Sequence, residues 1–150
     1  MARFSFRAMT EADARAVAEW RYPGEYAFYD ADADAGDLAE LMDAARWGRE
    51  YFAVDGEDGA LAGFFVVKRR GEAKEIGLGL HPDLTGRGLG SAFVEAGLAF
   101  AAPGPYLLQV AAFNVRAIRV YERAGFVAIE RHEHFTNGGR HPFVRMKRPA

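Results

Sequence analysis

The sequence predicts a mixed α/β (α+β) fold of seven strands and four helices in the order β-α-α-β-β-β-α-β-α-β-β. Three observations support this order. Apolar residues alternate with polar ones, or form short runs, in the segments assigned to strands, and they recur at helical spacing in the segments assigned to helices. Turns rich in glycine and proline separate the two kinds of segment. A length of 150 residues with 50% hydrophobic residues suits a single domain over residues 1–150.

The first two elements are a strand and a helix. Residues 2–8 alternate phenylalanine and alanine with arginine and serine, which is typical of a half-buried strand. Thr10 then caps a helix, and Asp13, three residues later, gives an imperfect capping box. The helix runs to about Trp20 and buries Val17 and Trp20.

An aromatic segment from Trp20 to Asp30 interrupts the chain after this helix. Pro23 and Gly24 end the helix. Tyr22 and three further aromatic residues follow within a stretch that is neither helical nor strand-like. This density of aromatic side chains is unusual for a solvated loop, so the segment either packs over the core or lines a pocket.

The middle of the chain predicts a helix and an antiparallel meander. Residues 37–47 place apolar side chains at i, i+3, i+4 and i+7, which indicates a helix with one apolar stripe. Strands over 50–54 and 61–68 are joined by a glycine- and acid-rich hairpin loop at 55–59. A third strand covers 73–80 after a short basic turn.

The stretch over residues 81–91 reads His-Pro-Asp-Leu-Thr-Gly-Arg-Gly-Leu-Gly-Ser and leads into a helix over 91–102. Its alternating glycines allow a tight turn and the close approach of a ligand. The free N–H groups and dipole of the following helix, together with Arg87, predict a site for a phosphate or pyrophosphate. A flexible surface turn with a solvated arginine is the alternative. The glycine spacing fits neither a Walker loop nor a dinucleotide-binding fingerprint.

The last third predicts a strand, a helix and a hairpin. Residues 106–112 are apolar on both faces, which indicates a central strand. Asn114 caps the next helix, and Gly125 ends it. Strands over 126–135 and 141–147 flank a Thr-Asn-Gly-Gly hairpin turn.

Composition excludes several classes of function. Lys and Arg number 19 against 21 Asp and Glu, and this balance argues against a dedicated nucleic-acid binder. The absence of cysteine excludes disulfides, thiolate metal sites and a cysteine nucleophile. His132 and His134 share one strand face, but no third ligand is evident, so no metal site is expected. No apolar run approaches the ~18 residues of a membrane span, and no signal peptide is evident, so a soluble, cytoplasmic protein is expected.

Two segments resemble the GCN5-related N-acetyltransferase (GNAT) family. The first is Thr85-Gly86-Arg87-Gly88-Leu89-Gly90, against a family loop of Gln/Arg-x-x-Gly-x-Gly/Ala. The second runs from Asn114 to Phe126 and matches every fixed position of Asn-x-x-Ala-x-x-x-Tyr-x-x-x-Gly-Phe. The element order is also similar over residues 2–147. Thr85 departs from the family pattern because it replaces the usual glutamine or arginine.

The resemblance implies acetyl-CoA as acyl donor and a mostly antiparallel seven-stranded mixed sheet, splayed between its fourth and fifth strands. The pantetheine arm would pair with the backbone of the fourth strand, whose N–H near Leu80 would polarise the thioester carbonyl. The pyrophosphate would lie on the glycine loop. The donor-binding residues so implied are Leu78, Leu80, Thr85, Gly86, Arg87, Gly88, Leu89, Gly90, Ser91 and Asn114.

The resemblance also implies that Tyr121 is the general acid, because a phenol is protonated at neutral pH and can donate a proton to the departing thiolate. By periodicity alone, Tyr121 is a core residue on the apolar stripe of its helix. A glutamate often lies five residues before the family asparagine, but Gln109 stands there. Glu75 is the best replacement as base, and Glu25, Asp30, Glu130 and solvent water are alternatives.

The acceptor pocket is expected between the aromatic segment and the final hairpin. Tyr22, Glu25, Tyr26 and Tyr29 suit a cationic amine through carboxylate pairing and cation–π contact, and Gln109 faces the same site. Aromatic packing under a lid is the alternative interpretation of these residues. The predicted function is direct acetyl transfer to a small-molecule or peptide amine. The alternative is a non-catalytic acetyl-CoA sensor or docking module. Members of the family often dimerise, so a homodimer is compatible with the resemblance.

Overall fold

The computed structural model describes residues 3–150, and its strands form one sheet in the order β1-β2-β3-β4-β5-β7-β6. The strands are β1 (Ser5–Ala8), β2 (Tyr51–Asp55), β3 (Leu61–Arg70), β4 (Ala73–Leu80), β5 (Tyr106–Ala111), β6 (Val127–Thr136) and β7 (Gly139–Arg148). The α-helices are α1 (Glu11–Glu19), α2 (Ala35–Leu41), α3 (Gly90–Ala101) and α4 (Val115–Arg123). Short 3-10 helices are η1 (Gly24–Tyr29), η2 (Ala31–Ala33), η3 (Ala44–Arg46) and η4 (Pro82–Leu84). The predicted fold class and element order are confirmed.

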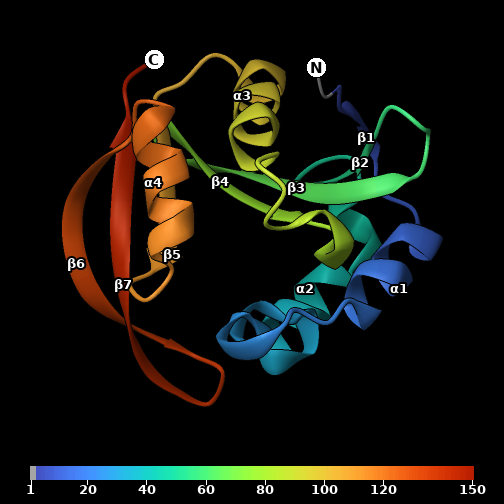
Figure 1. The fold of residues 1–150 in the computed structure, drawn as a ribbon, viewed down its shortest axis with the longest axis horizontal. Coiled ribbons are helices and arrows are strands. Elements are labelled where there is room, and N and C mark those ends of the chain that lie inside the picture. The colour runs from blue at the N-terminus through green and yellow to red at the C-terminus, as the bar shows by residue number, and fades with distance from the viewer. Residues whose placement is uncertain (1–2) are drawn as a thin grey trace.

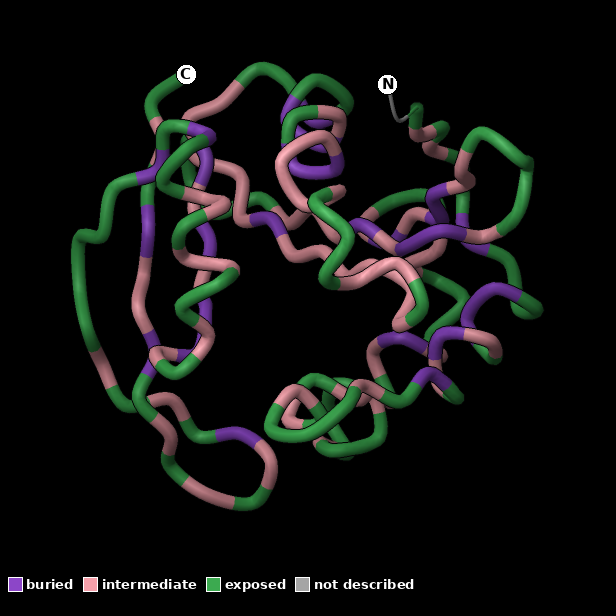
Figure 2. The backbone as a smooth tube through the Cα atoms, in the orientation of Figure 1, coloured by how far each residue is buried: buried purple, intermediate pink, exposed green. Residues whose placement is uncertain are grey.

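The helices cover the two faces of the sheet. Figure 1 shows α1 and α2 below β3 and β4, with α3 above them. Each side has its own apolar core. Phe65, Phe93 and Met146 centre the core beneath α3 and α4, whereas Trp20 and Leu41 belong to the core beneath α1 and α2. Burial also differs along the sheet, because most residues of the central strand β5 are buried, β7 is buried at Phe143 and Met146, and the edge strand β6 is largely exposed (Figure 2).

The sheet splits between β4 and β5. All other neighbouring strands are antiparallel, whereas these two are parallel and pair only at Lys74 with Tyr106 and Glu75 with Leu107. Beyond Glu75 the strands diverge. The N–H of Lys74 bonds to the Pro105 carbonyl beside β5, and peptide groups along a strand alternate sides every residue. The peptide groups of Leu78 and Leu80 therefore face the gap between the strands.

The start of α1 is fixed by a full capping box. The Thr10 hydroxyl accepts the N–H of Asp13, and the Asp13 carboxylate accepts the N–H of Thr10. Arg7 on β1 bonds both Asp13, at 2.6 Å, and Asp55 on β2, at 2.8 Å. The Arg7 guanidinium lowers the pKa of Asp13. Arg7 thus links the N-terminus of α1, through Asp13, to β1 and, through Asp55, to β2.

Most predicted boundaries lie within two residues of the observed ones, and two elements in the N-terminal half differ by more. The helix predicted over 37–47 is wrong as one element, because α2 ends at Leu41 and only the short η3 follows. Asp43 breaks it by accepting the N–H of Ala45, so Ala45 falls off the apolar stripe and is exposed. The first strand begins at Ser5, and the predicted start at residue 2 lies outside the described residues.

Glycine sets how closely α3 approaches the sheet. A Cβ added to Gly97 would lie 2.4 Å from Cε1 of Phe65 on β3, and one added to Gly63 would lie 2.8 Å from Cζ of Phe93 on α3. The Phe65 ring of β3 therefore packs directly on Gly97 of α3, and the Phe93 ring of α3 packs directly on Gly63 of β3. This close contact positions the N-terminus of α3 next to the end of β4.

Gly97→Ala is expected to destabilise the protein. Alanine favours a helix over glycine by about 1 kcal/mol, but a methyl group overlapping Phe65 costs about 1–3 kcal/mol. Urea denaturation should show a lower free energy of unfolding. Ala99→Gly on the exposed face of the same helix reports helix propensity alone. A Gly97→Ala variant more stable than the native protein would contradict the close packing of Phe65.

Candidate active site

A cleft of about 240 Å³ lies where the glycine loop meets α3 and α4. Gly86 and Gly88 have φ values of +74° and +75°, a conformation that favours glycine. This conformation turns the loop so that α3 begins at Gly90 with its free N–H groups at the cleft. A Cβ on Gly90 would lie 3.3 Å from Val120 on α4, so the two helices are close here. The predicted donor-site residues lining the cleft are Leu78, Leu80, Thr85, Gly86, Gly88, Leu89 and Gly90.

The positive charge of this cleft comes mainly from α4. Arg116 and Arg123 line it, whereas Arg87 is exposed and is not among the lining residues. The Thr85 hydroxyl donates to the Pro82 carbonyl at 2.8 Å, so this side chain closes the turn of η4. A pyrophosphate fits the cleft, since free helix N–H groups and two guanidinium groups complement its charge.

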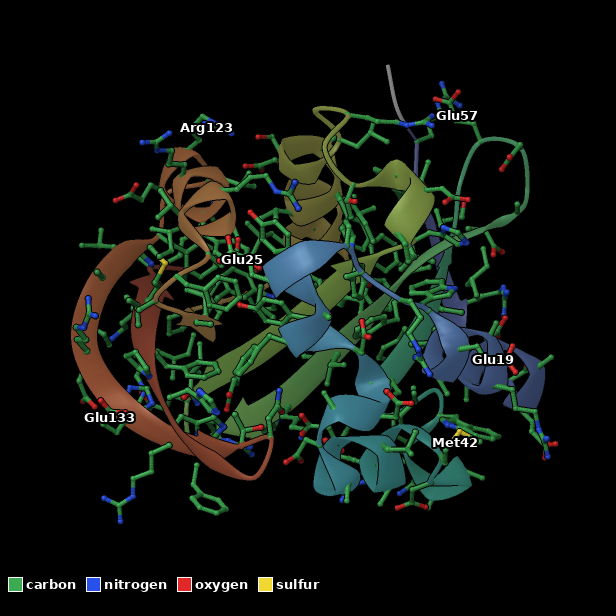
Figure 3. The ribbon with its side chains drawn as sticks, turned by 60° about the horizontal axis from the view of Figure 1, so that its bottom comes forward. Glu19, Glu25, Met42, Glu57, Arg123 and Glu133 are labelled. Carbon is green, nitrogen blue, oxygen red and sulfur yellow. The ribbon has the colours of Figure 1, made fainter. Side chains whose placement is uncertain are left out.

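An aromatic strap, residues 20–30, crosses the gap between β4 and β5. The Tyr22 hydroxyl donates to the Leu80 carbonyl at 2.7 Å. The Tyr29 hydroxyl accepts the Ala111 N–H of β5 at 3.1 Å. Each tyrosine hydroxyl thus hydrogen-bonds one backbone group, the Leu80 carbonyl or the Ala111 N–H, that has no strand partner at the split. The strap includes the blue coil in the middle of Figure 3, where Glu25 is labelled.

Tyr121 lies at the junction of the two spaces, because it lines both the donor cleft and a cavity of about 310 Å³ in the gap. Burial, and secondly the nearby Tyr29, raise the pKa of Tyr121, so its hydroxyl stays protonated at neutral pH. Among residues 3–150 its hydroxyl has no hydrogen-bond partner. Tyr121 therefore has a proton available to a group placed in the gap.

Asn114 caps α4 and also contacts the strap. Its side-chain oxygen accepts the N–H of Ala117 at 3.2 Å, and its amide nitrogen donates to the Tyr29 hydroxyl at 3.3 Å. Both ends of the amide are therefore used within the protein. The guanidinium carbon of Arg116, in the first turn of α4, lies 4.4 Å from the centre of the Tyr26 ring, so a second contact joins α4 to the strap.

Glu75 lies at the closed end of the split and does not line the gap. Its carboxylate pairs with Arg70 at 2.9 Å and accepts the Gln109 amide N–H at 3.2 Å. The Gln109 oxygen must then accept from Nε2 of His132, 2.9 Å away. In the neutral ring, Nδ1 of His132 is left as a buried acceptor without a hydrogen-bond partner among the described residues. Gln109, which lines the gap, thus links Glu75 on β4 to His132 on β6 by hydrogen bonds.

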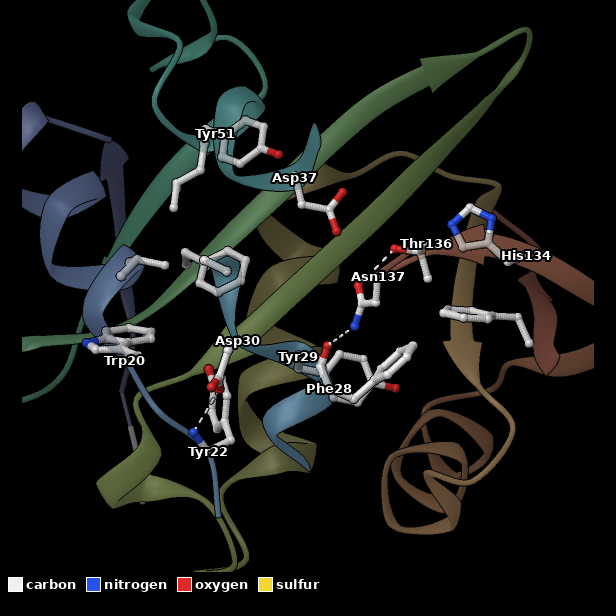
Figure 4. A pocket seen from close by; sticks show the side chains of 15 residues that line it. Trp20, Tyr22, Phe28, Tyr29, Asp30, Asp37, Tyr51, His134, Thr136 and Asn137 are labelled. Carbon is white, nitrogen blue, oxygen red and sulfur yellow. Dashed lines mark hydrogen bonds between the residues drawn. The ribbon is translucent and has the colours of Figure 1, made fainter. Parts of the chain in front are cut away.

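A second cavity, of about 250 Å³, lies on the α1 and α2 side of the split (Figure 4). We refer to it as the acceptor cavity. Aromatic rings form most of its wall, and Asp30 and Asp37 supply its carboxylates. Tyr22, Tyr29 and Phe64 line both the acceptor cavity and the gap, so the two spaces adjoin. Phe64 reaches this position because Gly79, on the neighbouring strand, has no Cβ to block it.

An acetyltransferase (GNAT) domain model matches residues 3–127. The chain belongs to the GNAT acetyltransferase family. This family assignment confirms the resemblance seen in the sequence. Within residues 3–150, no helix is long and apolar enough to cross a membrane, and no group of three or more metal-ligating side chains occurs.

Individual relatives agree with this assignment. Mycothiol acetyltransferase from Clavibacter michiganensis subsp. michiganensis (strain NCPPB 382) is 47% identical over 73 residues, which are 46% of this chain and 24% of that relative. Spermidine N-acetyltransferase from Vibrio cholerae in complex with CoA and spermine superposes with a TM-score of 0.73 at 19% identity, covering 96% of this chain and 94% of that one. The V. cholerae enzyme in complex with manganese ions gives a TM-score of 0.70 at 21% identity, covering 97% and 91%. At these identities the structural likeness shows a shared fold.

The gap and the donor cleft bring together most of the predicted residues. Nine of them line the gap: Tyr22, Tyr26, Tyr29, Leu78, Leu80, Thr85, Gln109, Asn114 and Tyr121. Glu25 is exposed and lines neither the gap nor the acceptor cavity, and Ser91 lies beside the donor cleft without lining it. Sequence reasoning missed Arg116, Phe64 and Asp37. A basic residue two positions after the capping asparagine is a signal that could have indicated Arg116.

Tyr29→Phe is expected to lower the free energy of unfolding by about 1–2 kcal/mol, because the Ala111 N–H and the Asn114 amide lose their acceptor. Tyr26→Phe is the matched control, since the Tyr26 hydroxyl makes no hydrogen bond within residues 3–150 and its ring keeps the Arg116 contact. Denaturant titration measures both variants. Equal stabilities would show that the Tyr29 hydroxyl does not hold the strap.

Proposed function

We propose that this protein transfers an acetyl group from acetyl-CoA directly to a primary amine of a small molecule. One observation carries the proposal: the gap adjoins both the donor cleft and the acceptor cavity, and Tyr121 lines the gap and the donor cleft. The two substrates would meet from opposite faces of the sheet. This arrangement supports direct transfer, for which no covalent enzyme intermediate is needed.

The donor cleft would hold the CoA pyrophosphate on the free N–H groups at the start of α3, with Arg116 and Arg123 adding charge. The pantetheine arm would enter the gap along β4. There the Leu78 and Leu80 peptide groups face the space, and the Leu80 carbonyl already accepts from Tyr22. The N–H of Leu80 would remain to hydrogen-bond the acyl oxygen. Such a donor is worth about 3–4 kcal/mol in other acyl transfers.

The reaction forms a C–N bond and breaks the C–S bond of the thioester. The amine nitrogen, in its neutral form, attacks the acetyl carbon. The nitrogen then loses one proton, and the CoA sulfur gains one from the Tyr121 hydroxyl, which is reprotonated from solvent. Atoms and charge balance without a metal or redox partner.

The proton lost by the amine would leave through water beside Gln109. The gap and a groove beside α2 meet at Gln109, Ile76 and Gly77, and Glu75 lines that groove. Glu75 would therefore act as base through water, without direct contact with the amine. The Glu75 side chain pairs with Arg70 at the end of this path.

The acceptor class follows from the cavity. Its aromatic walls and its two aspartates suit a cationic amine. The relatives are consistent with this, because the V. cholerae enzyme is described as a spermidine N-acetyltransferase and was solved with spermine. A CoA-release assay with monoamines, diamines, amino sugars and amino-terminal peptides tests the proposal. Tight acetyl-CoA binding without release with any amine would instead indicate a non-catalytic acetyl-CoA sensor.

Tyr121→Phe is expected to lower kcat about 100-fold or more while the Kd for acetyl-CoA stays nearly constant. The raised pKa of Tyr121 keeps its proton in place as pH rises, so the native enzyme should lose no activity from this group below about pH 10. Steady-state kinetics from pH 6 to 10 and calorimetry of acetyl-CoA binding measure these quantities. Unchanged turnover in the variant would remove Tyr121 from the mechanism.

A further inference from the structure

The segment from residue 30 to residue 40 carries five carboxylates, and four of them have partners within the protein. Asp30 accepts the N–H of Tyr22, and Asp32 pairs with Arg21. Asp34 accepts the N–H groups of Asp37 and Asn137. Glu40 pairs with Lys68 and accepts the Tyr51 hydroxyl.

The side chain of Asp37 is the exception. Within residues 3–150 its carboxylate makes no hydrogen bond or ion pair. Figure 4 shows it among the residues lining the acceptor cavity. Asp37 is exposed to solvent, and its side chain lies at the edge of the cavity. Desolvation there, then repulsion by Asp34 and Glu40, raise the pKa of Asp37, and the nearby His134 and Lys68 partly offset this. A charged carboxylate in this place is stabilised when a cation lies beside it.

The surroundings of Asp37 favour a cation that comes from outside the protein. No lysine or arginine lines the acceptor cavity, and His134 is the one basic side chain in its wall. Lys68 lines the neighbouring groove with Asp37, but its ammonium group pairs with Glu40. Trp20, Tyr51 and Phe143 are among the aromatic residues of that wall. Aromatic faces attract ammonium groups and also cover methylene chains.

Asp37 is remote from the reacting centre. It lines the acceptor cavity and the groove beside α2 that Glu75 also lines, whereas it lines neither the gap nor the donor cleft. Tyr22, Tyr29 and Phe64 form the other end of the acceptor cavity, where it adjoins the gap. An amine that reacts beside Tyr121 is therefore not the group that contacts Asp37. The carboxylate is placed for a second positive group on the same molecule.

We propose that the acceptor is a small aliphatic α,ω-diamine whose distal ammonium binds Asp37 while its near amine, uncharged, reacts in the gap. The methylene chain would lie along the aromatic walls between the two ends. This proposal rests on the proposed acetyl transfer and assigns Asp37 as a specificity-determining residue.

The test compares 1,4-diaminobutane with n-butylamine, which has the same chain length and lacks the second amine. In the native protein, the KM for the diamine should be at least tenfold below that for the monoamine. Asp37→Asn should raise the diamine KM about tenfold or more, with little change in its kcat and in either constant for butylamine. Asp32→Asn is the matched control, because Asp32 lies in the same segment and is exposed, as Asp37 is, but does not line the acceptor cavity.

Calorimetry of 1,4-diaminobutane binding separates this proposal from the proposed catalysis, because it needs no turnover. Diamine binding that weakens in Asp37→Asn alone supports the distal site even if no amine is acetylated. Equal KM values for the two amines, or equal effects of Asp37→Asn on both, would overturn it. Circular dichroism melting checks that Asp37→Asn is folded, and an unfolded variant is replaced by Asp37→Ser in the same assays.

Discussion

The site depends on one constraint, the divergence of β4 and β5 after two paired residues. Strand pairing normally satisfies the peptide groups of both neighbours, so a split in the middle of a sheet leaves polar groups facing an apolar interior. The protein satisfies one group on each side with a tyrosine hydroxyl, Tyr22 on Leu80 and Tyr29 on Ala111. The remaining groups of β4 face a cavity that a polar, extended ligand can enter. The same split therefore accounts for the binding of the strap and for the space in which a donor would lie.

Small residues and aromatic rings hold this geometry. Gly97 and Gly63 allow α3 to lie tightly on β3, which brings the glycine loop to the end of β4. Gly79 allows Phe64 to lie over the sheet on the other side, where it forms part of both the gap and the acceptor cavity. Asn114 and Arg116 connect α4 to the strap. The donor and acceptor sides are thus linked through the aromatic segment by contacts from α4.

Local patterns predicted most of the fold, because alternation, caps and turn residues act over a few positions. Thr10, Asn114 and Gly125 were expected at helix ends and lie there. The prediction of one helix over 37–47 was wrong because the Asp43 carboxylate accepts the Ala45 N–H and ends the helical hydrogen bonding, although the apolar spacing continues. Contacts between distant strands were not predictable from the sequence. The sheet order β5-β7-β6 places β6 two strands from β5, close enough for the His132 side chain to reach Gln109. Asp37 lines the acceptor cavity because α2 covers the same face of the sheet as the strap.

The central claim is that the gap beside β4 receives the thioester arm of the donor. Amide hydrogen exchange with and without CoA, resolved at single residues by NMR, tests it most directly. We expect slower exchange at Leu78 and Leu80 and at the loop amides of Gly88 and Gly90, with no change at Phe52 in the remote β2–β3 ladder. Slower exchange at the loop alone, with Leu78 and Leu80 unchanged, would contradict it, because the donor would then lie on the glycine loop without entering the sheet.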